Sequence, residues 1–428
     1  MKTKTKALIG TGIALLLAIA AVIVVIVFAV SQRKTAEIEN SLPLNAVLTI
    51  EQAQTDLEFM YEAVKENHPC YLDDSGLDET FDGAYEDAKN KLGSLELITV
   101  RDLWEIGAEM YCSIEDGHTL INFYGSKQIS DYEKLSGGKI ISVDGIPREE
   151  LLSRFRKVFP CEPQVDFYVD YMLDEALRLE SWNDLLEIDT SDGVIVEIQT
   201  EGGIETAQLI FAYPDLSMVV DTGEDGESFY SYELYEEQSA AVFTLDECAV
   251  TDGYKNALEE FFKGVSENNI SRIAIDLRRN GGGNSQVINE FMKYIDVDSY
   301  YVFGGAIVRD GDGLIENEAY LYKNKKSKYA YSGELYALTS NYTFSSAMDF
   351  AVAISDNGIG KVIGEIPGNM PTCYGDKLTF QAPNSKLLCG VSYKKFYRVD
   401  RTKDDIPLIP DIETDGKDAL DTFLNLNN

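Results

Sequence analysis

Apolar positions between residues 50 and 111 recur at steps of three and four, which is the period of an amphipathic helix. The pattern predicts three helices, one from residue 50 to the Asn-His-Pro sequence at 67–69 and two over residues 77–92 and 100–111. The first helix is expected to end there because the residue before a proline is driven out of the helical conformation. The region 35–118 is therefore predicted to be helical.

From residue 118 to residue 213 the pattern changes to short strands with helices between them. Strands are expected at 119–123, within 137–147, at 194–200 and at 206–211. The last two are predicted to form a hairpin around a Glu-Gly-Gly turn. A stretch rich in Gly, Asp, Glu and Ser at 221–231 then indicates a boundary, so the region 119–231 is expected to be rich in β-structure.

After residue 231 the predicted strands and helices alternate regularly. Strands are expected at 240–245, 270–276 and 334–338, and helices at 254–265, 285–294 and 347–356. Alternation of this kind is typical of a layered α/β core, which we expect over residues 232–428. The fold class predicted for the whole chain is accordingly α+β with an α/β core.

The N-terminus carries an unbroken apolar stretch at residues 13–30, preceded by Lys2, Lys4 and Lys6. Its length suffices to cross the hydrocarbon layer of a membrane. Lysines on the short leading side place the N-terminus in the cytoplasm. Residues 1–34 are therefore expected to form a cytoplasmic stub and a single-pass anchor in the cell membrane, with the remainder extracytoplasmic. A cleaved secretory signal is the alternative, although its apolar region is usually shorter.

The chain is strongly acidic, with 73 Asp and Glu residues against 37 Lys and Arg residues and a formal net charge of −36. Such a charge argues against nucleic acid as a partner. The six cysteines show no C-x-x-C spacing, and we expect no metal site and no cofactor. Cys373 and Cys389, which are nearest each other in the sequence, are the favoured pair for proximity.

A strand, a turn and a helix follow one another across residues 334–356. Small hydroxylated residues fill the turn between the predicted strand and helix. A serine at such a helix N-terminus lies where free N–H groups and the helix dipole favour a developing anion. Taken alone, a serine there is more often an N-cap. Ser340, Ser345 and Ser346 are the candidates for a nucleophile.

A run of three glycines, Gly281, Gly282 and Gly283, follows the predicted strand at 270–276 and opens a helix. No Gly-Lys-Ser/Thr sequence follows, so the run is not a phosphate loop. Glycine lets the backbone approach a substrate closely, although such a run is more often a flexible connection. The loop is a candidate source of backbone N–H donors.

Together these two turns resemble the family of tail-specific (C-terminal-processing) serine peptidases, which includes the tricorn core. The matching residues are Asp-Leu-Arg-Arg-Asn-Gly-Gly-Gly at 276–283, the serine pair at 345–346, Asp356 and Gly364-Glu365. The resemblance extends over about residues 52–425. It implies a serine endopeptidase acting on protein or peptide substrates without a metal or cofactor. It also implies a PDZ-like module in the β-rich middle and a core of the ClpP/crotonase type.

The resemblance assigns roles to the two turns. Gapless spacing to Asp356 and Gly364-Glu365 selects Ser345 as the nucleophile. The backbone N–H of Ser346 would then be one oxyanion donor. The other would come from Gly282 or Gly283.

Histidine is the usual base at neutral pH, and the chain contains only His68 and His118. The sequence Asp-Gly-His-Thr at 116–119 matches the tricorn-like branch of the family, which implies that His118 is the base. The other branch uses a lysine. The same gapless spacing places Met370 at that position, and the nearest lysine is Lys377.

The resemblance also implies an acidic residue that orients the base and precedes a Pro-Asp pair, here at 410–411. Asp400, Asp404 and Asp405 are all candidates, and Asp400 is preferred. The rival hypothesis is a catalytically silent, surface-anchored peptide-binding module that kept the fold. It rests on the missing lysine and on the open choice of acid. The oligomeric state is left open.

Overall fold

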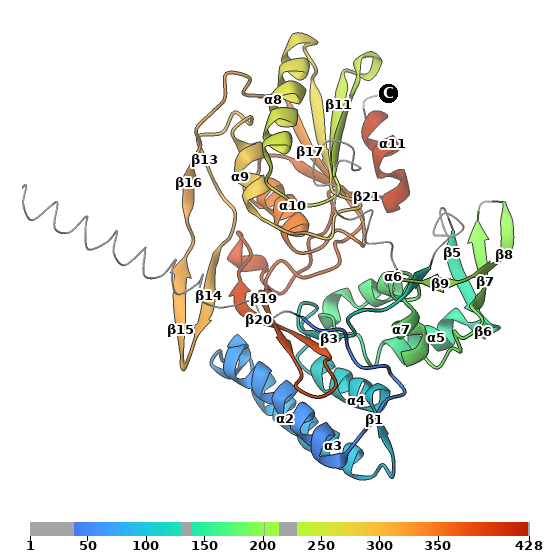
Figure 1. The fold of residues 1–428 in the computed structure, drawn as a ribbon. Coiled ribbons are helices and arrows are strands. Elements are labelled where there is room, and N and C mark those ends of the chain that lie inside the picture. Colours follow the sequence, from blue (N-terminus) through green and yellow to red (C-terminus); the bar gives the residue numbers. More distant parts are fainter. Residues whose placement is uncertain (1–37, 130–137, 201, 214–228, 427–428) are drawn as a thin grey trace, which may run out of the picture. The chain divides into compact units, whose positions relative to one another are not determined.

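Helices and several β-sheets are interleaved along the chain, so the fold is mixed α+β, as the sequence predicts (Figure 1). The computed structural model describes residues 38–129, 138–200, 202–213 and 229–426. Residues Ser41–Asn428 form one compact unit. The predicted domain boundaries within it stay predictions.

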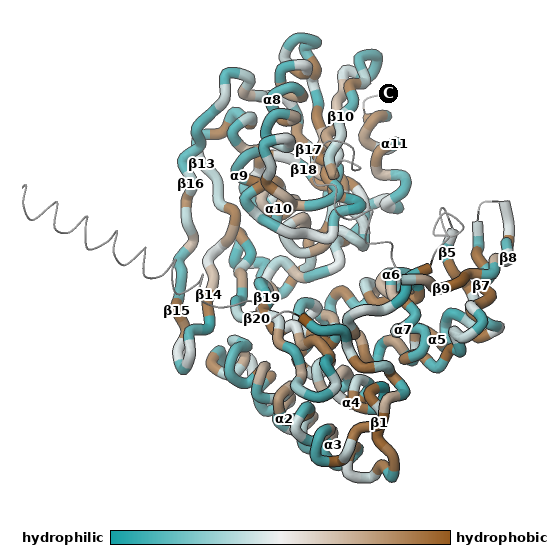
Figure 2. The backbone as a smooth tube through the Cα atoms, in the orientation of Figure 1, coloured by the Kyte–Doolittle hydropathy of each residue, from teal (hydrophilic) through white to brown (hydrophobic). Residues whose placement is uncertain are grey.

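The N-terminal region is helical, and the three predicted helices are confirmed. They are α2 (Ile50–Asn67), α3 (Leu77–Gly93) and α4 (Val100–Cys112). Thr49 and Thr99 begin α2 and α4 with capping boxes, in which the threonine side chain and the third helical residue bond each other's backbone N–H groups. The alternation of hydrophobic and hydrophilic positions along α2 and α3 is visible in Figure 2. A short strand pair, β1 (Val47–Leu48) with β2 (Ile98–Thr99), precedes α2 and α4.

The middle of the chain contains a four-stranded antiparallel sheet in the order β6-β5-β7-β8. Its strands are β5 (Lys139–Val143), β6 (Ile146–Pro147), β7 (Val194–Thr200) and β8 (Gly203–Leu209). The predicted hairpin is present as β7 and β8. Three helices accompany the sheet, namely α5 (Arg148–Phe155), α6 (Phe167–Ala176) and α7 (Glu180–Leu185). A further pair joins β4 (Gln128–Ile129) to β9 (Phe211–Ala212). The PDZ-like character of this region stays a prediction.

The C-terminal part is built on a six-stranded sheet, which is parallel from β11 onward and has the antiparallel β10 at its edge. In sheet order the strands are β10 (Tyr230–Tyr235), β11 (Ala240–Leu245), β12 (Arg272–Asp276), β17 (Glu334–Thr339), β18 (Lys361–Gly364) and β21 (Ile412–Glu413).

Helices cover both faces of this sheet, so the predicted layered core is confirmed (Figure 1). One face packs against α8 (Asp252–Glu267), α9 (Gln286–Met292) and α10 (Ser346–Asp356). The other packs against α11 (Ala419–Leu424). Successive residues of one strand point to opposite faces of the sheet and pack in different hydrophobic clusters. Ile273 belongs to the first hydrophobic cluster and Ala274 to the second.

A second, five-stranded sheet joins the segment after the N-terminal helices to the C-terminal region. Its strands are β3 (Leu120–Asn122), β14 (Gly305–Asp310), β15 (Gly313–Glu318), β19 (Cys373–Gln381) and β20 (Leu388–Phe396). Leu120 in β3 pairs with Gly390 in β20, which brings the segment just after His118 to the C-terminal region. The remaining pair is β13 (Ser299–Tyr301) with β16 (Leu321–Lys323).

All six cysteines are free thiols. The favoured pair is wrong, because Cys373 and Cys389 lie at opposite ends of the β19–β20 hairpin. Cys373 pairs with Phe396 and Cys389 pairs with Phe380.

The predicted transmembrane anchor needs correction. In the part of the chain that the structure describes, no helix combines the length and the apolar character that crossing a membrane requires. The predicted segment itself, residues 13–30, lies outside the described residues. The membrane as a partner and the single-pass location in the cell membrane are therefore unsupported.

Candidate active site

The glycine loop and the serine turn emerge side by side from the core sheet. Strands β12 and β17 are parallel neighbours, with Asp276 opposite Leu338, so both chains leave the sheet at the same edge. Cross-links then fix the two turns to each other. Thr343 Oγ1 donates to the carbonyl of Leu277 at 2.9 Å, and the N–H of Phe344 donates to the carbonyl of Asn280 at 3.1 Å.

Gly282 lies directly against the candidate nucleophile. A Cβ atom at this position would lie 2.7 Å from the Cβ of Ser345 and 3.1 Å from the backbone nitrogen of Ser346. Gly282 also has a φ of +106°, a conformation that residues with a side chain rarely adopt. Both observations require glycine here.

Ser345 stands at the N-terminus of α10 in a strained conformation, with φ 54° and ψ −128°. Positive φ is uncommon outside glycine and is typical of functional sites. The backbone N–H of Ser345 donates to Oδ1 of the fully buried Asn369 at 2.7 Å, which holds the turn in place. In the described part of the chain its hydroxyl has no hydrogen-bond partner, so the oxygen is available for reaction.

The hydroxyl of Ser346, by contrast, is occupied. It donates to the carbonyl of Gly283 at 2.8 Å and accepts from Oγ of Ser285 at 2.7 Å. The N–H of Gly282 donates to Oδ1 of Asn280 at 2.8 Å. Among the described residues, the N–H of Gly283 makes no hydrogen bond, and that of Ser346 lies in the first helical turn, where no intrahelical acceptor exists.

His118 reaches the serine turn through an aromatic contact. Its ring centroid lies 4.7 Å from that of Phe344, the residue before Ser345. The His118 side chain is 12% exposed, and neither ring nitrogen has a hydrogen-bond partner within the described residues. The structure thus places His118 beside the turn without a hydrogen bond to Ser345.

The fully buried carboxylate of Asp116 organises the turn that carries His118. Its Oδ2 atom accepts from the hydroxyls of Thr119 and Ser392, each at 2.6 Å, and its Oδ1 accepts from the N–H of His118 at 2.9 Å. Burial opposes ionisation of Asp116. The hydrogen bonds and charges of His118 and His68 outweigh it and hold the pKa well below its usual range. Oδ1 lies 3.6 Å from Nδ1 of His118.

His68 belongs to the support of Asp116. Its Nδ1 accepts from the N–H of Cys70 at 3.2 Å, so Nε2 carries the proton and faces Oδ2 of Asp116 at 3.3 Å. The two histidines of the chain therefore contact different oxygens of the same carboxylate. His68 contacts Oδ2 of Asp116, and His118 contacts Oδ1.

Glu162 is a further acidic residue at this turn. The residue is 7% exposed, and neither carboxylate oxygen has a partner of good geometry among the described residues. Burial, and then the charge of Asp116, raise the pKa of Glu162 to about 8, and nearby backbone N–H groups offset this only in part. One ligand atom each from Asp116, His118 and Glu162 lie within 4.8 Å of one another, so these side chains could hold a metal ion.

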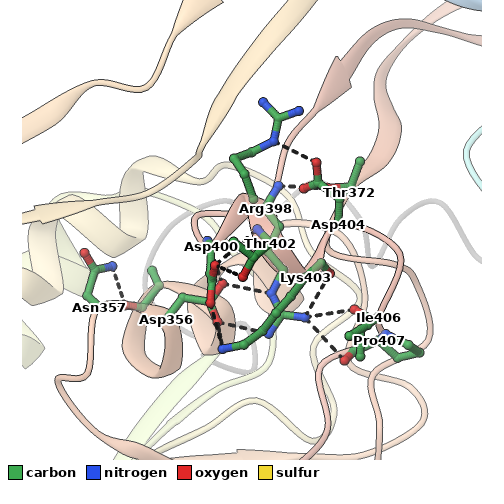
Figure 3. A network of polar contacts seen from close by, with 12 residues as sticks. Asp356, Asn357, Thr372, Arg398, Asp400, Thr402, Lys403, Asp404, Ile406 and Pro407 are labelled. Carbon is green, nitrogen blue, oxygen red and sulfur yellow. Dashed lines mark hydrogen bonds and ion pairs between the residues drawn. The ribbon is translucent and has the colours of Figure 1, made fainter. Parts of the chain in front are cut away.

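Asp400, the preferred third catalytic residue, takes part in a different network (Figure 3). Its carboxylate accepts from Oγ1 of Thr402 at 2.6 Å and lies 2.9 Å from Nζ of Lys403. These hydrogen bonds lower the pKa of Asp400 to about 2. Within the described residues none of its contacts is with His118.

The other two candidate acids are also engaged elsewhere or exposed. Asp404 accepts from Oγ1 of Thr372 at 2.6 Å, and Asp405 is exposed. The side chain of the family-pattern Asp356 is fully buried and forms a forked ion pair with Arg398 at 2.8 and 2.9 Å (Figure 3). Asp356 therefore anchors the segment that leads to Asp400.

The position expected for a lysine base is apolar. Met370 is 3% exposed and packs in a small cluster with Val165 and Cys373. Lys377 is exposed on β19, and no hydrogen bond or ion pair of the described residues joins it to Ser345.

A cavity of about 1090 Å³ opens near the same edge of the core sheet. Asp276, Arg278 and Ser340 line it, but Ser345 and His118 do not. The cavity is adjacent to the two turns and does not contain the reacting groups.

Three residues of this site were not assigned roles from the sequence. Asp116 carries a signal, because it stands two residues before His118 in the Asp-Gly-His-Thr sequence. Asn369 and Glu162 carry none, since both lie outside any recognised pattern.

Comparison with known proteins bears on the two turns. Residues 241–414 match the model of peptidase family S41. Mature CPAF is similar over 88% of this chain and 96% of its own, at 12% identity and a TM-score of 0.63. A putative peptidase from Parabacteroides merdae is similar over 88% of this chain and 98% of its own, at 14% identity and a TM-score of 0.51. At such identities the structural likeness shows a common fold. The family model spans both the glycine loop and Ser345, so residues 241–414 are similar to peptidase family S41, and this similarity supports a serine-type peptidase.

Proposed function

We propose that this chain is a serine endopeptidase of the tricorn-like branch, in which Ser345 is the nucleophile and His118 the base. The observation that carries the proposal is the free Ser345 hydroxyl, held at a strained helix N-terminus against the glycine loop. The ring of His118, whose two nitrogens have no hydrogen-bond partner among the described residues, packs on the neighbouring Phe344. The substrate is a peptide bond of a protein or peptide.

In the first step Ser345 Oγ attacks the scissile carbonyl, and Nε2 of His118 takes the hydroxyl proton. The resulting imidazolium directs its Nδ1–H toward the ionised Asp116. The 3.6 Å separation is long for a hydrogen bond, as is common in a free enzyme, and shortens when the complex forms. We assign the orienting role to Asp116 rather than Asp400, because of these two described carboxylates Asp116 contacts His118 and Asp400 does not.

The tetrahedral intermediate needs donors for its oxyanion. The N–H groups of Ser346 and Gly283 are suited to this, since neither is committed to another acceptor among the described residues. Each such donor is worth about 3–4 kcal/mol of transition-state stabilisation. Gly282, whose N–H is bound by Asn280, supplies the open space beside Ser345 instead.

His118 then returns its proton to the leaving amine, and the peptide bond breaks to leave an acyl group on Ser345. A water molecule, deprotonated by His118, hydrolyses this ester by the same route. The side chain at the lysine position, Met370, takes no part because a thioether is not a base at neutral pH.

Labelling with a fluorophosphonate probe tests the nucleophile. Wild type should label and hydrolyse an unstructured protein substrate, and Ser345→Ala should do neither while unfolding at nearly the same temperature. Ser346→Ala is the matched control, because it keeps the backbone N–H and should label, although the glycine loop loses one hydrogen bond of about 1 kcal/mol.

Two results would contradict the assignment. Labelling that persists in Ser345→Ala and disappears in Ser346→Ala would move the nucleophile by one residue. A folded wild type that never labels would favour a silent peptide-binding module.

A further inference from the structure

Asp116, His118 and Glu162 gather their ligand atoms in a small buried space. One nitrogen or oxygen from each lies within 4.8 Å of the other two. Oδ1 of Asp116 and Nδ1 of His118 are 3.6 Å apart. Two ligands of a tetrahedral zinc ion are roughly 3.4 Å apart, given bonds of about 2.1 Å, so this pair needs almost no movement.

A second observation points independently to a ligand. Both oxygens of Glu162 and both ring nitrogens of His118 are buried and lack hydrogen-bond partners among the described residues. Buried polar atoms are normally satisfied, and an orphaned group requires an explanation. Oε2 of Glu162 lies 3.3 Å from the place a Cβ of Gly117 would occupy, so the carboxylate faces the turn between Asp116 and His118.

The remaining ligand, Asp116, is held as metal ligands usually are. Oδ2 is fixed by Thr119, Ser392 and His68, whereas Oδ1 accepts, among the described residues, only the N–H of His118 and keeps a lone pair. Hydrogen bonds of this kind to a metal-binding side chain orient it before the ion binds.

We propose that Asp116 Oδ1, His118 Nδ1 and Glu162 bind a divalent transition-metal ion of the zinc type, and that this ion inhibits the peptidase. One imidazole with two carboxylates suits zinc, whereas calcium and magnesium prefer oxygen ligands alone. The two carboxylates neutralise the charge of the ion. A water molecule fills the fourth position. The inhibitory effect rests on the proposed function, whereas the binding does not.

Inhibition follows from the protonation of the imidazole. A neutral ring has one nitrogen with a proton and one with a lone pair. An ion on Nδ1 takes the lone pair and leaves the proton on Nε2. His118 then has no site for the proton of Ser345, and the attack cannot proceed by general-base catalysis. Coordination forms and breaks no covalent bond, so removal of the ion restores the enzyme.

The test uses the full-length protein with Co²⁺ and Zn²⁺ as probes. Co²⁺ should give the visible absorption bands of a tetrahedral complex, and Zn²⁺ should displace it. Micromolar Zn²⁺ should block fluorophosphonate labelling and peptide hydrolysis, and EDTA should restore both. Glu162→Gln, which is nearly isosteric, should bind Co²⁺ at least roughly tenfold more weakly and should need at least roughly tenfold more Zn²⁺ to halve its own metal-free activity.

Two controls isolate the site. Glu115→Gln changes an exposed carboxylate beside Asp116 and should leave the zinc response intact. Cys161→Ser removes the thiol next to Glu162 and should also have no effect. Zinc inhibition that survives in Glu162→Gln but is lost in Cys161→Ser would overturn the proposal in favour of a thiol site. If Glu162→Gln does not fold, His118→Asn serves for the Co²⁺ measurement and should abolish the bands.

The outcomes separate the two proposals. Cobalt bands that depend on Glu162 in a protein without hydrolytic activity would uphold the metal site and contradict the proposed function. Hydrolysis that is insensitive to Zn²⁺, in a protein that gives no cobalt bands, would overturn the metal site and leave the peptidase in place.

Discussion

Gly282 lies so close to Ser345 that a Cβ atom on the glycine would be 2.7 Å from the Cβ of the serine. Side chains essentially never come this near, so Gly282→Ala must move the backbone of one turn. We expect kcat/KM to fall on the order of a hundredfold, because displacing reacting groups by an ångström costs about that much. Steady-state hydrolysis of a peptide substrate measures the effect.

Gly281→Ala is the matched control. A Cβ there would meet only the far end of the Tyr342 side chain, at 3.1 Å, and a small movement of that side chain relieves the contact. Similar losses in both variants would mean that the loop needs general flexibility rather than contact between Gly282 and Ser345.

The two histidines should respond differently to alanine. His118→Ala should reduce hydrolysis by several orders of magnitude, as the loss of one member of a nucleophile–base pair does. His68→Ala removes a hydrogen bond to buried Asp116, so it should mainly lower the free energy of unfolding, by roughly 1–3 kcal/mol. Urea unfolding and turnover, measured on both variants, separate the roles. An active His118→Ala enzyme that loses activity on replacement of Lys377 would revive the lysine mechanism.

The local elements of this fold were predictable because their signals are local. Helix α2 begins at Thr49 because the threonine and Gln52 satisfy each other's N–H groups within one turn. The parallel strands β11, β12 and β17 were predictable for a similar reason, since each is a short apolar run bounded by turn residues.

The hydrogen bonds that hold the turn of His118 could not be predicted from the sequence, because they join distant segments. Ser392 lies 276 residues after Asp116, to which its hydroxyl donates, and it reaches Asp116 only through the pairing of β3 with β20. Among the described residues Asp400 makes no contact with His118, and the sequence could not show this for the same reason. In a chain with 73 acidic residues, spacing alone does not distinguish a carboxylate beside the base from one in a neighbouring network.

Replacing Asp116 or Asp400 by asparagine tests which of the two carboxylates orients His118, the proposed base. Asp116→Asn keeps the size of the side chain but removes the charge that stabilises the imidazolium, so kcat should fall by a factor on the order of a hundred or more with KM little changed. Asp400→Asn should leave kcat nearly unchanged, because Asp400 contacts Thr402 and Lys403. The reverse ranking in steady-state kinetics would restore Asp400 as the third catalytic residue.

Asp73 should make the free energy of unfolding depend on pH in the acidic range. Burial opposes its ionisation, but hydrogen bonds from Ser75, Tyr374 and Lys395 prevail and lower its pKa. The stabilisation is complete above the unfolded pKa of about 3.9 and is lost as the pH falls through the lower folded value. The difference in unfolding free energy between wild type and Asp73→Asn should therefore be constant at neutral pH and shrink below about pH 4. The exposed Asp74→Asn should match wild type throughout, and a pH-independent difference for Asp73→Asn would contradict the mechanism.

The forked ion pair of Asp356 and Arg398 should respond more strongly to the loss of one partner than to the loss of both. The side chain of Asp356 is fully buried and that of Arg398 is 4% exposed, so Arg398→Met leaves a buried carboxylate whose remaining cation, Lys403, lies 4.0 Å away. We expect that variant to lose about 3–5 kcal/mol of unfolding free energy, since breaking a buried pair typically costs that much. The double variant Arg398→Met/Asp356→Leu should recover much of the loss, because two apolar side chains of similar volume replace the pair without burying a charge. Urea denaturation of the three proteins measures this. Additive losses would show that the pair acts through its backbone contacts, such as the 2.8 Å bond from Arg398 to the carbonyl of Ile406, rather than through charge compensation.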